Sequence, residues 1–181
     1  MSHRFAQGAS AAIMILASTA AFGQTRSQMT PGDQQFIKEA AIGGQFEVDA
    51  GKLAAQSANP QVKQFGEKMV QDHGTADAQL KNIVQAQGAT APSGLDPKHA
   101  QLRNRLASLK GEAFDREYIT QMVKDHDEDA KKFADEQRNT KDPQLKQFAE
   151  QTLTVIKEHD QMARQIAGTM GIKVSARDKR G

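Results

Sequence analysis

Four proline-containing pairs divide this chain, and each has the form that opens an α-helix. The residue before the proline can cap the first turn with its side chain, and proline is favoured at the first helical position because no hydrogen-bonded N–H is needed there. The four pairs are Thr30-Pro31, Asn59-Pro60, Asp96-Pro97 and Asp142-Pro143. The fifth proline, Pro92, lies in a Gly- and Ala-rich stretch over 88–94 that is typical of a loop.

Between these pairs, apolar residues recur every three or four positions, which is the spacing of one face of a helix. Alternation at the spacing of a β-strand is absent at useful length. The pattern predicts long helices over 31–57, 60–87, 112–139 and 143–168, with a short helix over 97–109. The predicted fold class is therefore all-α, an antiparallel four-helix bundle whose short helix lies in the crossover between the second and third long helices.

Two internal similarities indicate how the helices pair. The sequence NPQVKQFGE at 59–67 nearly repeats as DPQLKQFAE at 142–150, so the second and fourth long helices begin alike after tight turns. The sequence MVQDH at 69–73 reappears as MVKDH at 122–126. We therefore expect the first two long helices to form one hairpin and the last two another, joined by a long crossover like that of ferritin-like folds.

Composition excludes several classes of protein. Hydrophobic residues make up 38% of the chain and aromatic residues 5%, which suits a core of aliphatic side chains. The 24 Lys and Arg nearly cancel the 22 Asp and Glu, so we expect no broad cationic face for nucleic acid. The absence of Cys excludes disulfides and a lipid-modified cysteine anchor.

The N-terminus has the pattern of an export signal. Arg4 is followed by an apolar stretch over 9–21 and by Ala21-Phe22-Gly23, a typical cleavage site. That stretch is about thirteen residues long, whereas a membrane-spanning helix needs about twenty, so a retained anchor is the weaker alternative. We predict a signal peptide over 1–23, the helical domain over 24–170 and a basic disordered tail over 171–181. The mature protein is then periplasmic, with outer-membrane association left open and no membrane span.

One side chain able to bind a metal falls on the apolar face of each long helix: Glu47, His73, His126 and His159. At about 1.5 Å per residue, all four lie roughly the same distance from their turns, near the middle of the bundle. Three imidazoles and a carboxylate at one level could form a site for Zn, Cu or Fe.

The neighbours of the three histidines bear on this interpretation. Each histidine has a methionine one turn away, at Met69, Met122 or Met162, and soft sulfur would favour copper, although methionine is more often core filler. Asp72 and Asp125 could orient a ring on an adjacent helix. A di-iron carboxylate site is disfavoured, because the Glu-x-x-His motif is missing: Val70, Val123 and Ile156 precede the three histidines by three residues.

No enzyme motif stands out. Nucleophile elbows, phosphate-binding loops and dinucleotide glycine patterns are absent, and Gly43-Gly44 is expected to allow close helix packing. A third hypothesis is an oxidoreductase that uses a bound metal together with Tyr118, which lies on the predicted core face. We expect a protein without enzymatic activity.

The helical faces and histidines together resemble the bacterial family called Domain of Unknown Function 4142. The resemblance covers about 33–168, and its carriers are QFEV at 45–48, GKLA at 51–54, VKQF at 62–65, MVQDH at 69–73, FDREY at 114–118, His126, LKQFA at 145–149 and His159. It implies a ferritin-like four-helix bundle and an exported location, with no settled activity.

Two hypotheses of different classes follow. In the first, the exported bundle binds a divalent or soft metal ion through His73, His126, His159 and Glu47, in metal handling or envelope stress. In the second, the protein is a structural or interaction module, and the histidines only satisfy one another in a polar core. The sequence names no protein partner.

Overall fold

The structure, a computed structural model, describes residues 29–176. The predicted signal peptide over 1–23 lies outside the described residues. Within 29–176 all regular structure is helical, which confirms the predicted all-α fold class. The helices are α1 (Pro31–Ala54), α2 (Pro60–Ala86), α3 (Pro97–Ser108), α4 (Gly111–Asn139) and α5 (Pro143–Thr169). The largest difference from prediction is the end of α1, expected at 57 and observed at Ala54.

The capping residues act as the sequence predicts. Thr30 and Asp33 form a reciprocal capping box: the Thr30 hydroxyl accepts from the Asp33 amide at 3.1 Å, and the Asp33 carboxylate accepts from the Thr30 amide at 2.7 Å. Asn59 and Asp142 each accept hydrogen bonds from two amides of the following turn. The helix that lacks such a cap, α4, begins at Gly111, whose φ of +55° favours glycine.

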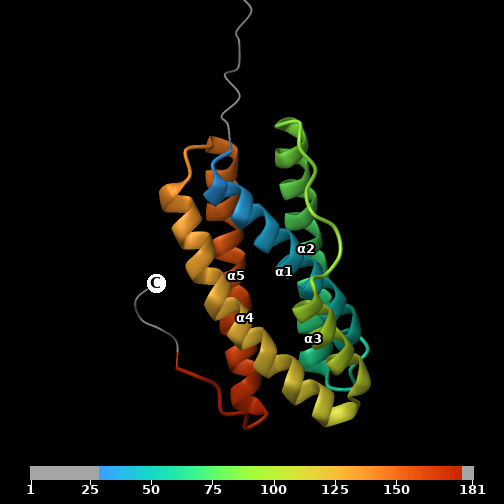
Figure 1. Ribbon diagram of the computed structural model, residues 1–181. Helices are drawn as coiled ribbons and strands as arrows, with labels where there is room; N and C mark the ends of the chain where they lie inside the picture. The colour runs from blue at the N-terminus through green and yellow to red at the C-terminus, as the bar shows by residue number, and fades with distance from the viewer. Residues whose placement is uncertain (1–28, 177–181) are drawn as a thin grey trace, which may run out of the picture.

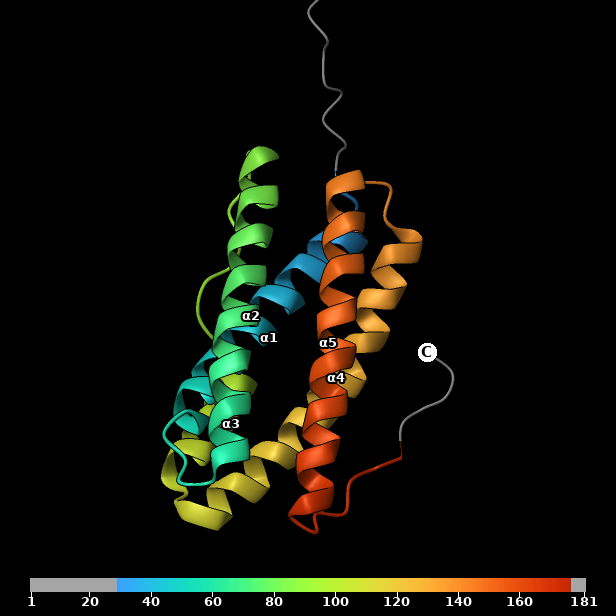
Figure 2. The ribbon, with the colours of Figure 1, turned by 180° about the vertical axis from the view of Figure 1, so that it is seen from behind.

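The long helices form two antiparallel hairpins, α1 with α2 and α4 with α5 (Figure 1). The hairpins associate through α2 against α5, which lie side by side in Figure 2, and through α1 against α4. The connection after α2 runs back along the molecule to α3, which packs on α1 and α4. Every neighbouring pair of long helices is therefore antiparallel.

The core consists of two hydrophobic clusters separated by a polar layer. The lower cluster, near the turn between α1 and α2, includes Phe46, Phe65, Met69, Tyr118 and Met122. The upper cluster, near the turn between α4 and α5, includes Phe36, Leu80, Phe133, Phe148 and Ile156. Between them in each long helix lies a buried polar residue, and these four residues form what we call the polar layer: Glu47, His73, His126 and His159.

Glycines at the α1–α2 crossing bring the two backbones together. A Cβ on Gly66 would lie 2.7 Å from the Ala54 side chain and 2.7 Å from the Ala55 amide nitrogen. Gly43 and Gly44 do not have this role, so the expectation of close packing there is wrong: nothing lies within 4 Å of a Cβ at Gly44, and only the Asp129 carboxylate lies within that distance of one at Gly43, 3.9 Å away.

Beyond α5 the chain continues along the lower cluster. Ile172 and Val174 pack against that cluster, and the remainder of the predicted tail, residues 177–181, lies outside the described residues. None of the described helices combines the length and the hydropathy that crossing a membrane requires.

Candidate metal centre

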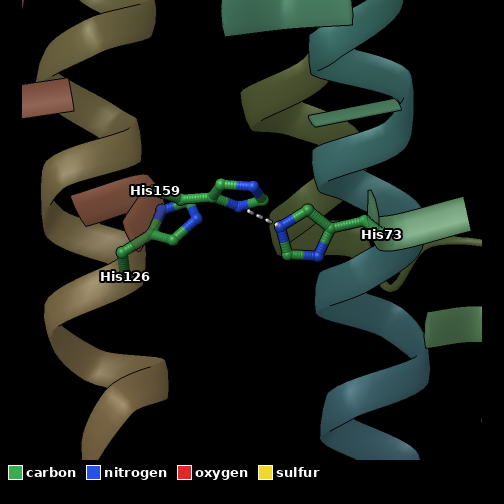
Figure 3. Close-up of side chains that lie close together, drawn as sticks. All are labelled: His73, His126 and His159. Atoms are coloured by element: carbon green, nitrogen blue, oxygen red, sulfur yellow. Dashed lines mark hydrogen bonds between the residues drawn. The ribbon is translucent and has the colours of Figure 1, made fainter. Parts of the chain in front are cut away.

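The four predicted side chains meet in the polar layer. His126 and His159 are fully buried, His73 is 5% exposed and Glu47 is 2% exposed. The ring centroids of the three histidines lie 5.1, 5.4 and 5.7 Å apart, and Figure 3 shows the rings pointing toward one another from three helices. The predicted convergence at one level is therefore present in the fold.

His126 has a defined tautomer and one nitrogen without a hydrogen bond. Its Nδ1 lies 2.7 Å from the carbonyl oxygen of Met122, so Nδ1 carries the hydrogen and donates it. Its Nε2 is then left with a lone pair, and Glu47 Oε1 lies 3.6 Å from it. Neither of these two buried atoms has a hydrogen-bond partner among the described residues.

His159 is oriented by a carboxylate from another helix. Its Nε2 lies 2.8 Å from Asp72 Oδ2 and donates to it, which leaves the lone pair on Nδ1. Asp72 also pairs with Lys68 at 2.8 Å, and these bonds hold its pKa below the ordinary value although burial acts in the opposite direction. Metal-bound histidines are commonly held by such a carboxylate. The ring-orienting role expected of Asp72 is thus observed.

His73 joins the other members of the polar layer. Its Nε2 lies 3.2 Å from His159 Nδ1, the bond drawn in Figure 3, and its Nδ1 lies 3.1 Å from Glu47 Oε2. Because His159 Nδ1 is an acceptor, His73 donates from Nε2 and accepts at Nδ1 from a protonated Glu47. Burial raises the pKa of Glu47 well above its usual range, and the charges of Asp129 and Asp125 raise it further, which agrees with this arrangement.

Burial also keeps the imidazoles uncharged. It lowers the pKa values of His73 and His126, and it lowers that of His159 to about 4. The neighbouring His126 lowers the pKa values of His73 and His159 further. A neutral imidazole offers a lone pair, and this is the form that binds metal ions. At neutral pH the layer therefore presents ligands rather than cations.

The donor atoms are close enough together that they could hold one ion. One ring nitrogen from each histidine lies within 4.8 Å of the others. Ligands about 2.0–2.1 Å from a tetrahedral ion are about 3.3 Å apart. Two distances in the polar layer are close to that value. Glu47 Oε1 lies 3.6 Å from His126 Nε2, and His73 Nε2 lies 3.2 Å from His159 Nδ1, where His73 would have to give up its Nε2 hydrogen to bind an ion.

Other residues singled out in the sequence lie outside the polar layer. Met69 and Met122 are core residues of the lower cluster. Asp125 does not orient a histidine ring: it accepts from Gln121 on its own helix at 2.8 Å. Tyr118 stacks on Phe114 with ring centroids 5.7 Å apart, and its hydroxyl has no hydrogen-bond partner among the described residues, so it is a packing residue.

Sequence reasoning missed Asp129, which lies beside the site. It lines the same surface groove as Glu47 and Asp125 and contributes to raising the pKa values of both. The acidic run DHDED at 125–129 is visible in the sequence, but a charge run usually marks a solvated face. Only the tertiary packing shows that it borders the centre.

Comparison with solved structures shows which fold the chain shares. It superposes on a DUF305 fragment from Deinococcus radiodurans with a TM-score of 0.68 and 14% identity, covering 77% of this chain and 97% of that one. A DUF305 protein from Streptomyces coelicolor, described as a "putative secreted protein", gives a TM-score of 0.68 and 11% identity, covering 80% of this chain and 96% of that one. At such identities the likeness shows the fold alone.

Sequence comparison gives the family. A search of curated proteins found no match. The model of the family described as Domain of unknown function (DUF4142) matches residues 18–166. This range includes α1 to α4, most of α5 and all four members of the polar layer. The chain therefore belongs to the DUF4142 family.

Proposed function

We propose that this protein binds a single divalent or soft transition-metal ion in the polar layer, through His73, His126, His159 and Glu47. The observation that carries the proposal is the pair of buried atoms, Glu47 Oε1 and His126 Nε2, that have no hydrogen-bond partner among the described residues. Leaving a buried polar atom unsatisfied costs about 1–3 kcal/mol, and an ion between the two would satisfy both.

The ligand set indicates what such an ion would do. Three imidazoles and one carboxylate complete a four-coordinate shell, whereas catalytic zinc sites keep a position open for water or substrate. A closed shell favours holding or carrying the ion over catalysis, so we propose a role in metal handling without enzymatic activity. Imidazole and carboxylate ligands suit Zn, Cu or Fe.

The test is metal titration of the purified protein after removal of bound metal with a chelator. We expect one ion per chain for Zn²⁺, Cu²⁺, Cu⁺ or Fe²⁺, with a higher melting temperature, and we expect His126→Ala to abolish both effects. His99→Ala is the matched control, because His99 lies on α3 and is bonded to Asp96 rather than to the polar layer. Absence of binding and of any thermal shift with all four ions would refute the proposal.

The alternative is a structural module with a purely structural polar core. It is favoured by the continuous chain of contacts from Glu47 through His73 and His159 to Asp72, in which most ring nitrogens are already bonded. It predicts that no ion changes the stability of the protein. The same titration separates the two functions.

We also propose that the protein is exported to the periplasm. The N-terminal sequence pattern supports this, as does the description of the Streptomyces coelicolor neighbour. Cell fractionation with N-terminal sequencing should find a mature chain that begins at Gln24. Recovery of the uncleaved chain from the cytoplasm would contradict it.

A further inference from the structure

A groove of about 340 Å³ opens between α1, α4 and the start of α3, and Glu47 is among the residues that line it. Six acidic side chains and three lysines line this groove. Even without Glu47, which is protonated, and the partly buried Asp125, the four remaining carboxylates outnumber the lysines, so the potential of the groove is negative. The acidic residues are Glu39, Glu47, Asp96, Asp125, Glu128 and Asp129. The groove therefore attracts cations, and it connects the solvent with a member of the polar layer.

Two carboxylate oxygens on the wall of this groove have no hydrogen-bond partner among residues 29–176. They are Glu47 Oε1 and Asp125 Oδ2, and both atoms are buried. Glu47 is 2% exposed, so water does not freely replace the missing partner. Buried carboxylate oxygens without donors are the ligands that a cation requires, and here they lie along one groove.

Gly43 and Gly44 keep the inner part of the groove open. Gly43 lines the groove, and Gly44 lines a small cavity of about 20 Å³ that also borders Glu47 and His73. Glycine inside a helix is destabilising relative to alanine, and no helix approaches these two positions closely enough to require it. What the two glycines provide is space about one turn before Glu47.

We propose that this groove is the route by which a metal ion enters the centre: the acidic mouth attracts the hydrated cation, Gly43 lets it pass, and Glu47 releases its proton to solvent as it receives the ion and transfers it to the three imidazoles. The inference rests on the metal-binding function proposed above. The groove on the opposite side, between α2 and α5, also reaches His73, but Asp72 is its one acidic lining residue. The acidic groove is therefore the route that charge favours.

Lys132 lies at the mouth of the route. Its ammonium group is 3.1 Å from Asp129 on α4 and 3.7 Å from Glu39 on α1, so it bridges the two walls. An entering ion has to compete with this resident charge for the same carboxylates. A divalent ion competes better than a monovalent one, so Lys132 makes the entrance selective for divalent cations.

The test measures how fast the metal-free full-length protein takes up Co²⁺, followed by visible absorption in a stopped-flow instrument. Gly43→Leu, which fills the groove, should slow uptake about tenfold or more, whereas Gly74→Leu, at an open position in α2, should leave the rate unchanged. Asp129→Asn should slow uptake severalfold and weaken its dependence on salt. The charge control on the same helix is Asp135→Asn, because Asp135 is exposed and paired with Arg138.

The results separate the route from the site. Wild-type uptake rates in both Gly43→Leu and Asp129→Asn would overturn the route while leaving the metal centre intact, and the Asp129 variant decides the matter if the Gly43 variant fails to fold. Faster uptake by Lys132→Gln would support the route. If the wild-type protein takes up no Co²⁺ and gains no thermal stability from it, the metal-binding function fails and the route fails with it.

Discussion

Glu47 Oε1 and His126 Nε2 face each other across 3.6 Å between α1 and α4, and neither atom is hydrogen-bonded to a described residue. The ring nitrogens of His73 and His159, by contrast, all have polar partners within hydrogen-bond distance. The three histidines therefore differ in how they are held in the metal-free fold. This difference leads to the first prediction.

His126→Leu and His159→Leu should have different effects on the metal-free protein. His126→Leu loses one bond to a helix carbonyl, so we expect the free energy of unfolding to change by less than about 1 kcal/mol. His159→Leu removes a partner from both His73 and Asp72, and we expect a loss of about 1–3 kcal/mol. Urea denaturation of the metal-free variants measures both. Equal losses would contradict the assigned contacts.

Asp72→Asn should weaken metal binding without removing a ligand. The Asp72 carboxylate accepts from His159 Nε2 and fixes the tautomer that exposes Nδ1, and loss of such support typically costs about 10–100-fold in affinity. Asp77→Asn is the matched control, because Asp77 forms the same kind of ion pair on α2, with Lys81, and holds no histidine. Competition titration with a chelator gives both affinities. An unchanged affinity in Asp72→Asn would show that the carboxylate does not support the ligand.

Glu136→Gln should stabilise the protein increasingly as pH rises. Burial raises the pKa of Glu136 to about 7, and the adjacent Asp33 carboxylate contributes. The folded state thus favours protonated Glu136, and this contribution to stability is complete below the unfolded-state pKa of about 4.3 and is lost as pH rises through about 7. Glutamine stays neutral, so its advantage should grow by about 1–2 kcal/mol between about pH 5 and about pH 8.

Denaturation curves at the two pH values check this expectation. Glu150→Gln, at an exposed position on α5, serves as the control and should show no such change. A difference between wild type and Glu136→Gln that is the same at both pH values would mean that Glu136 titrates normally in the folded protein.

Gly66→Ala should be strongly destabilising. The added methyl group would lie 2.7 Å from the Ala54 side chain and from the Ala55 amide nitrogen, and 2.8 Å from the Gly51 carbonyl oxygen, so the helices must separate. We expect a loss of about 2–3 kcal/mol. Gly74→Ala, with open space around its Cβ, should instead gain about 0.5–1 kcal/mol from helix propensity. Thermal unfolding distinguishes them, and similar melting temperatures would contradict the close crossing.

The helices and their order could be predicted from sequence because their signals are local. A capping side chain before proline fixes where α1, α2, α3 and α5 begin, and these four starts were predicted correctly. The start of α4 lacks a side-chain cap and was placed one residue late, at 112 instead of Gly111. The convergence of Glu47 with the three histidines followed from counting residues from the turns, since helical rise is constant.

What could not be predicted depends on contacts between helices. Spacing alone does not tell whether a small residue faces a neighbouring backbone or open space, so Gly43-Gly44 was interpreted as a packing site, while Gly66 makes the close approach. The same limit applies to Asp72 and Asp125, which occupy matching positions before His73 and His126. One orients a ring and the other lines a groove, because their helices have different neighbours.

The polar layer takes one side chain from each long helix and lies between the two hydrophobic clusters. The covalent turns join each hairpin only at its end, so an ion held in the layer would fasten the two hairpins to each other at mid-length. Loss of the ion would remove this link, and the two hairpins would then separate more readily. The lifetime of the bound ion and the resistance of the chain to proteolysis would consequently rise and fall together.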